Sequence, residues 1–278
     1  MKPFAALVRK VVHESRGTLL LTAAALFGLG WLSVYITSRN ESQILKAIAS
    51  GELGERLEWL RRLGIGKAPS SVELMMAFWN HPFFVTLVAI WGISRGSAAV
   101  SAEIERGTMD LLLSRPVSRT AYLLAQVLVA VLGLCVLGAA LAAGAILGVH
   151  YNTLRVPPGA WELIRVSANL AALALPIYGY TLLISTVDHV RWRPTWIGST
   201  LTLAGFIGHV ITAFPVFAES WWKPWVDRVS IFSAYDPVEL VTKAESFGPH
   251  VGILAGVGGA CVVLGFILFA RRDLPANG

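Results

Sequence analysis

The chain has 278 residues, of which 55% are hydrophobic and only 14% are charged, and its formal net charge at pH 7 is +6. An ordinary soluble domain carries about 25% charged residues, whereas the mean hydropathy of this chain is +0.63. A water-soluble fold of this length cannot hide so much apolar surface. The composition excludes an ordinary soluble domain and predicts an all-α, polytopic membrane protein.

Six apolar runs are long enough to cross a hydrocarbon core, which requires about 20 helical residues. In chain order they cover residues 18–36, 82–102, 121–149, 164–187, 195–217 and 251–270. We therefore expect residues 1–278 to form a single transmembrane domain with six transmembrane helices. With both termini inside, the inner side holds twelve basic and six acidic residues and the outer side eleven of each. This distribution favours an N-in, C-in topology.

Residues 1–16 resemble the start of a secretory signal, with Lys2, Arg9 and Lys10 before an apolar run. That run is longer than the 7–15 residues of the apolar region in a signal peptide, so we expect an uncleaved first span. Apolar residues recur at helical spacing before it: Phe4, Leu7, Val8, Val11 and Val12. They predict a short amphipathic helix over residues 1–16 at the inner interface; the alternative is a frayed tail.

The predicted extracytoplasmic loop over residues 37–81 carries apolar residues at helical spacing between Ile44 and Leu60, with glycines at Gly51, Gly64 and Gly66. This pattern predicts two short amphipathic helices. We favour a small cap packed on the outer ends of the spans over a substrate-binding lid.

A second extracytoplasmic segment, residues 218–250, mixes aromatic and charged side chains around Trp221, Trp222 and Trp225. Such mixtures belong at the headgroup level, so the segment is expected to be a dipping interfacial helix. A gate at the outer exit is the alternative. Within the spans, Arg95 and His209 are candidates for a pathway because ionisable groups at membrane depth are often functional.

Residues 101–120 form a compact charged segment between the second and third apolar runs. Ser101 is expected to cap a short helix that Gly107 interrupts. Thr108 is expected to cap a second short helix that ends before Pro116, and Ser118 or Thr120 to begin the third span. From physics alone, the leucines Leu111, Leu112 and Leu113 either rest on lipid or form a docking knob for a partner protein.

The order Glu-x-Glu-Arg-Gly-Thr-Met-Asp-Leu-Leu-Leu-Ser-Arg-Pro-Val-Ser-Arg, from Glu103 to Arg119, closely resembles the loop between the second and third spans of the type-2 ABC transporter permease family. The resemblance implies a cytoplasmic coupling hairpin at residues 101–120 that touches an ATPase subunit. The residues it assigns to ATPase coupling are Glu103, Glu105, Arg106, Gly107, Thr108, Asp110, Leu111, Leu112, Leu113, Arg115 and Pro116.

The chain has no phosphate-binding loop of its own. Its only Gly-Lys pair, Gly66-Lys67, is followed by Ala68, and Arg61 stands where a Walker A loop needs its first glycine. We therefore expect no cofactor on this chain, with ATP and Mg²⁺ bound by a separate ABC ATPase subunit. Cys135 and Cys261 both fall inside apolar runs and indicate neither a disulfide framework nor a metal site.

The sequence thus favours a permease subunit, expected to be an exporter, in the cell membrane. Its expected partners are an ABC ATPase, a second permease copy and the lipid bilayer, with no nucleic acid. The alternative is a membrane-embedded enzyme or assembly factor acting through its outer loops. An enzyme needs a nucleophile with its base or a metal cluster at membrane depth, and no sequence pattern for either is present. The sequence does not indicate the cargo.

Overall fold

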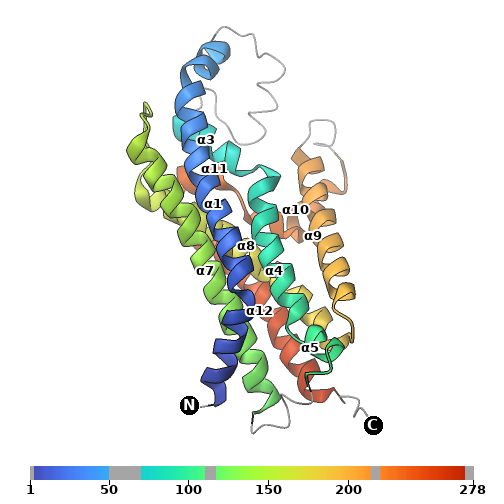
Figure 1. Cartoon of the computed structure of the whole chain (residues 1–278). Coiled ribbons are helices and arrows are strands. Elements are labelled where there is room, and N and C mark those ends of the chain that lie inside the picture. Colours follow the sequence, from blue (N-terminus) through green and yellow to red (C-terminus); the bar gives the residue numbers. More distant parts are fainter. Residues whose placement is uncertain (1–2, 50–69, 110–116, 214–219, 273–278) are drawn as a thin grey trace.

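The computed structural model describes residues 3–49, 70–109, 117–213 and 220–272 (Figure 1). All elements in this part of the chain are helical. In chain order they are α1 (Pro3–Ala49), α3 (Ser71–Trp79), α4 (Pro82–Ala98), α5 (Ser101–Glu105), α7 (Arg119–Tyr151), α8 (Ala160–Val187), α9 (Trp192–Ala213), α10 (Lys223–Val229), the 3-10 turn η2 (Ile231–Ala234), α11 (Pro237–Thr242), the 3-10 turn η3 (Ala244–Ser246) and α12 (Phe247–Arg271).

The all-α, multi-pass membrane class is confirmed. Four helical stretches are long and apolar enough to cross a membrane: Phe4–Gln43, Arg119–Tyr151, Ala160–Val187 and Ala244–Arg271. The pair α3 and α4, bent by 44° at residues 80–81, makes a fifth if it is counted as one span. Helix α9 lies where the fifth apolar run is expected, but it does not reach the same hydropathy because serine, threonine and glycine dilute its apolar residues. A sixth span therefore stays a prediction.

The first helix differs from the sequence-based expectation. Residues 3–49 form one continuous helix of 47 residues. Residues 3–16 are therefore not a helix separate from the first span, and the segment predicted as a loop from residue 37 begins as helix. No proline interrupts this stretch, and an isolated glycine such as Gly17 costs only about 1 kcal/mol relative to alanine. At 1.5 Å per residue the helix is about 70 Å long, so it extends beyond a hydrocarbon core of about 30 Å at both ends.

Helix α1 packs along α7, and Figure 1 shows the two side by side. Gly144 of α7 makes this possible. A Cβ atom at Gly144 would lie 2.0 Å from the backbone oxygen of Phe27, so only glycine fits. Close backbone approach at small residues is the usual way for membrane helices to pack.

The outer end of the bundle is organised around α3. Its Trp79 is fully buried, donates through Nε1 to Ser33 Oγ of α1 at 2.9 Å, and accepts at its backbone oxygen from Tyr235 Oη at 2.9 Å. Asn169 Nδ2 of α8 donates to the Ala234 backbone oxygen at 3.0 Å. These contacts hold η2 and the residues next to it in the core. The 218–250 segment is therefore not interfacial throughout, because two of its aromatic residues, Phe232 and Tyr235, are buried in the bundle. The second of the helices predicted in residues 37–81 lies outside the described residues.

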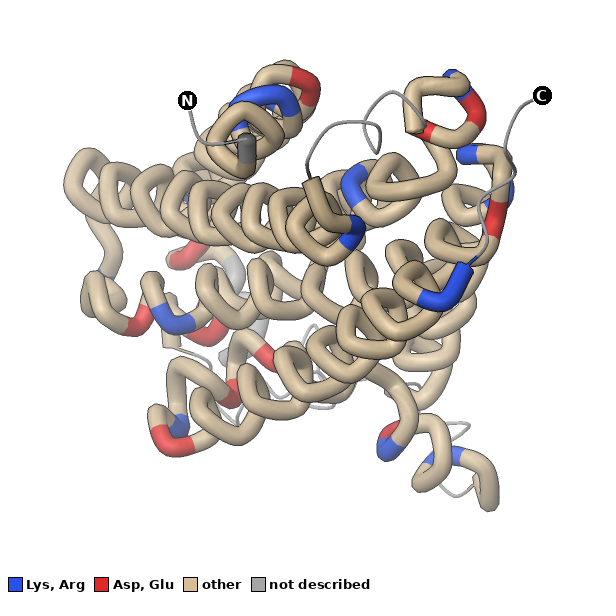
Figure 2. Tube along the Cα trace, turned by 90° about the horizontal axis from the view of Figure 1, so that it is seen from below, with Lys and Arg blue, Asp and Glu red and all other residues tan. Residues whose placement is uncertain are grey.

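Both ends of the chain lie at the same end of the bundle, which we call the inner end (Figure 1). Figure 2 views the molecule from this end and shows Lys and Arg on the segments nearest to both termini. The short helix α5 and the starts of α7 and α9 lie here as well. The described residues of the charged segment, 101–109 and 117–120, thus lie at one end of the helical bundle.

Candidate functional site

The break in the charged segment occurs where the sequence predicts it. Helix α5 ends before Gly107, whose φ of +67° is a left-handed conformation that favours glycine. Ser118 caps α7, because its side chain accepts from the Ala121 backbone N–H at 3.1 Å. The remaining hairpin residues of the prediction lie outside the described residues: Asp110, Leu111, Leu112, Leu113, Arg115 and Pro116.

Ser101 does not cap α5, which corrects the sequence-based expectation. The helix begins at Ser101 itself. Val100 occupies the cap position, and its side chain makes no capping hydrogen bond. Ser101 Oγ instead donates to the Ser97 backbone oxygen at 2.8 Å. The reason is that α4 continues almost to this point, so a carbonyl of its last turn is within reach of the hydroxyl.

Glu103 points into the molecule, and its side chain is only 3% exposed. Lys10 Nζ of α1 donates to Glu103 Oε1 at 2.8 Å, and Thr108 Oγ1 donates to Glu103 Oε2 at 2.5 Å. Burial alone would raise the pKa of Glu103, but the hydrogen bonds from Lys10 and Thr108 and the nearby positive charges outweigh burial and lower the pKa. The carboxylate therefore stays ionised at neutral pH and joins α5 to α1.

Glu105 and Arg106, in contrast, lie at the surface. Glu105 Oε2 accepts from the Arg191 backbone N–H at 2.8 Å, which links the end of α5 to the loop before α9. Arg106 is exposed and follows α5 directly. The two side chains thus occupy the part of the charged segment that a second protein can reach.

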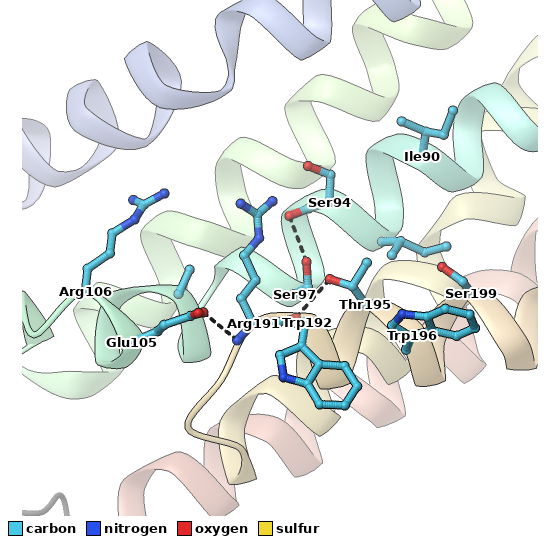
Figure 3. A pocket seen from close by; sticks show the side chains of 12 residues that line it. Ile90, Ser94, Ser97, Glu105, Arg106, Arg191, Trp192, Thr195, Trp196 and Ser199 are labelled. Carbon is cyan, nitrogen blue, oxygen red and sulfur yellow. Dashed lines mark hydrogen bonds between the residues drawn. The ribbon is translucent and has the colours of Figure 1, made fainter.

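A cavity of about 800 Å³ adjoins these residues between α4, α5 and α9 (Figure 3). Its inner part is polar and carries Glu105, Arg106 and Arg191, whereas Ile90, Ile93 and Trp196 line it at greater distance from the charged segment. The other lining residues are Ser94, Ser97, Ala102, Trp192, Thr195 and Ser199. Such an amphipathic lining suits a ligand or a protein segment with a polar and an apolar part.

Arg95 does not line this cavity. It is 6% exposed and donates through Nη2 to Gln126 Oε1 of α7 at 2.8 Å. Gln126 Nε2 donates to Tyr122 Oη at 2.9 Å, and Tyr122 Oη donates to the Ala99 backbone oxygen at 2.6 Å. The structure therefore places Arg95 in a buried hydrogen-bond chain between α4 and α7.

The other candidate pathway residues lie far along the bundle, near the outer end of α9. His209 is in α9, and its ring lies 6.4 Å from that of Phe232 in η2. Trp221 lies before α10 and is 82% exposed, Trp225 lies on α10 and is 62% exposed, and Trp222 lies between them. These residues form an outer group that is separate from Arg95 and from the charged segment.

The contacts of several residues at the inner end could not be predicted from the sequence. Lys10, Tyr122, Ser185 and Arg191 all hold α5 or its neighbours, yet each comes from a different part of the chain. Arg191 alone carries a sequence signal, because it lies in a short polar interruption between two apolar runs. The others are single polar residues beside or within apolar helices, and nothing in the sequence states which backbone groups they meet.

A bundle of long apolar helices, with a short charged helix at one end and a cavity beside it, indicates a multi-pass membrane protein. The model of the ABC-2 family of transporter proteins matches residues 14–274. The chain therefore belongs to this family, and it is a membrane permease of the ABC transporter class. A comparison with curated proteins gives no match.

Proposed function

We propose that this chain is the membrane-spanning subunit of an ABC exporter that is driven by a separate ATPase. The family match over residues 14–274 carries this proposal. The absence of a Walker A sequence supports it, because hydrolysis then needs another subunit. In this proposal ATP and Mg²⁺ bind to the partner ATPase, the complex lies in the cell membrane, and six spans place both termini in the cytoplasm.

The proposed ATPase contact is the surface of the charged segment around Glu105 and Arg106, continued by residues 110–116. Glu105 is joined to the loop before α9 through the Arg191 backbone N–H. Movement imposed on this surface would reach both α4 and α9, which flank the cavity. A second permease copy is proposed to face this cavity, so that the two copies enclose the pathway. Glu103 is proposed to act from within, by holding α5 against α1.

The direct test is the composition and activity of a co-expressed complex. We expect co-expression with the cognate ATPase, sought first among the products of neighbouring genes, to yield two copies of each subunit by native mass spectrometry. The purified permease alone should neither bind nor hydrolyse ATP. Recovery of only a lone polypeptide from such co-expressions would contradict the proposal.

Variants of the charged segment test the coupling role. Leu112→Ala and Glu105→Ala should weaken ATPase binding by about tenfold or more if either side chain is an interface anchor. Membrane insertion should be unchanged because neither residue lies in an apolar run. Glu58→Ala, in the predicted outer loop, is the control. Wild-type binding and ATPase stimulation in all three variants would remove the coupling role.

A further inference from the structure

The joint between α4 and α5 leaves backbone groups without partners in their own helices. Helix α4 ends at Ala98, and α5 begins at Ser101. The first amide groups of a helix and the last carbonyl groups of the preceding one have no intrahelical partner. This joint is buried, with Ala99, Val100 and Ser101 all 0% exposed. Water therefore does not satisfy these groups, and hydrogen bonds within the protein have to do so.

Ser185 of α8 satisfies the amide side of the joint. Its Oγ accepts from the backbone N–H of Val100 at 3.2 Å and from that of Ser101 at 3.0 Å. The same hydroxyl lies 3.2 Å from the Ser97 backbone oxygen, to which it can donate. Because α5 has no capping side chain of its own, the hydroxyl of Ser185 caps this helix from a different part of the chain.

Tyr122 of α7 satisfies the carbonyl side. Its hydroxyl donates to the Ala99 backbone oxygen at 2.6 Å and is only reachable from inside the bundle, since Tyr122 is 2% exposed. The same hydroxyl accepts from Gln126, which in turn holds Arg95. The joint is thus fixed from two sides by helices that are distant in sequence from α5.

From this geometry we infer that Ser185 and Tyr122 are positioning residues, which cap the α4–α5 joint from α8 and α7 and make α5 move together with these helices. The inference rests on the proposed function, in which α5 belongs to the ATPase contact. A helix of 5 residues is too short to hold its own conformation in water. The start of α5 is held by what residues 99–101 are bonded to, and these partners are the two positioning residues.

This arrangement gives the ATPase a firm attachment to the bundle. If α5 could rotate freely about residues 99–101, a force from the ATPase on its surface would only rotate α5. With the joint capped, the same force is transmitted to α7 and α8. Helix α8 contacts α4, α7, α9 and α12, so it is well placed to distribute the movement.

Matched variants test the inference. Ser185→Ala removes the capping hydroxyl, whereas Ser167→Ala removes a buried hydroxyl of the same helix whose Oγ has no partner among the described residues. Tyr122→Phe removes the second contact, whereas Tyr180→Phe removes a hydroxyl of α8 that bonds to Thr202 of α9. Ser185→Thr keeps a hydroxyl at the capping position and serves as the rescue variant.

The first measurement is hydrogen exchange of residues 97–109 in the purified full-length permease in lipid nanodiscs. Ser185→Ala should raise the exchange rate of this peptide by about fivefold or more, because the loss of a single buried hydrogen bond is expected to give about fivefold and the variant loses two. Ser167→Ala and Tyr180→Phe should leave it unchanged, and Ser185→Thr should restore the wild-type rate. Unchanged exchange in both Ser185→Ala and Tyr122→Phe would overturn the inference.

The second measurement is ATP hydrolysis and ATPase binding in the reconstituted complex. Ser185→Ala and Tyr122→Phe should weaken binding or stimulation by about fivefold, Ser167→Ala and Tyr180→Phe should not, and Ser185→Thr should restore the wild-type values. Faster exchange without any change in binding or stimulation would also overturn the positioning role. If the wild-type chain binds no ATPase, the proposed function itself fails, and the positioning role fails with it.

Discussion

At the scale of single residues, the lack of a side chain can matter as much as its presence. Gly144 allows the backbones of α1 and α7 to touch, since a Cβ atom there would lie 2.0 Å from the Phe27 oxygen. A Cβ atom at Gly28, on α1, would have no heavy atom of another helix within 4 Å. Two glycines with similar sequence surroundings therefore have opposite tolerance for a methyl group.

We expect Gly144→Ala to destabilise the protein by about 1–3 kcal/mol, because the helices must separate or shift to admit the methyl group. Gly28→Ala should be neutral or slightly stabilising, because alanine is the better helix former. The midpoint of thermal unfolding in detergent measures both. Equal midpoints for the two variants would show that the close approach is not required.

Glu103 gives the inner end a dependence on pH. Its pKa is lowered in the folded state, so its contribution to stability is complete above the ordinary pKa of 4.5 and is lost as the pH falls through the lower, folded-state value. At pH 7, Glu103→Gln should cost about 2 kcal/mol, the typical value of a hydrogen bond to a charged group. Below the folded-state pKa the variant and the wild type should converge.

Unfolding by denaturant at several pH values measures this difference. The matched control is Glu14→Gln, because Glu14 lies 3.6 Å from the same Lys10 Nζ but is 35% exposed. An exposed pair four residues apart on a helix contributes only about 0.3–0.5 kcal/mol. A constant difference between wild type and Glu103→Gln from pH 7 down to pH 3 would contradict the assigned role of the carboxylate.

At the scale of elements, α9 decides how many times the chain crosses the membrane. It runs along the bundle beside α4 and α8 (Figure 1), yet its hydropathy is lower than that of the other long helices. Packing explains how a less apolar helix can belong in a bundle. Thr202, for example, is buried and donates to the Gly198 oxygen at 2.7 Å, so its hydroxyl is not exposed to lipid.

We predict that α9 spans the membrane. In a variant without Cys135 and Cys261, Arg193→Cys at the start of α9 should be protected from a membrane-impermeant maleimide in intact cells. Arg228→Cys, on α10 beyond the other end, should react. Both positions are exposed, so accessibility within the fold does not distinguish them. Labelling of both from the same side would show that α9 does not cross.

At the scale of the whole molecule, the start of α1 and the end of α12 both lie at the inner end (Figure 1). The excess of basic residues predicted for the cytoplasmic side is consistent with this arrangement. We expect Ala276→Cys, near the C-terminus, to react with the maleimide only after the membrane is made permeable. Thr153→Cys, exposed between α7 and α8, should react in intact cells. The reverse pattern would invert the topology.

Features that depend on local chemistry can be predicted from the residues in chain order. Hydropathy places α7, α8 and α12 within a few residues, because the apolar length of a span is read directly along the chain. The break at Gly107 and the cap at Ser118 follow from backbone preferences that neighbouring residues control. The order of residues around them also led to the family.

Contacts between residues far apart in the chain follow only from the packing of the helices. The tertiary structure joined residues 3–49 into one helix, drew η2 into the core beside Trp79, and turned Glu103 inward to Lys10, 93 residues away in sequence. It also showed that the capping group of α5 is Ser185 and not Ser101. A polar side chain in an apolar helix has many possible partners, and only the packing of the helices selects one.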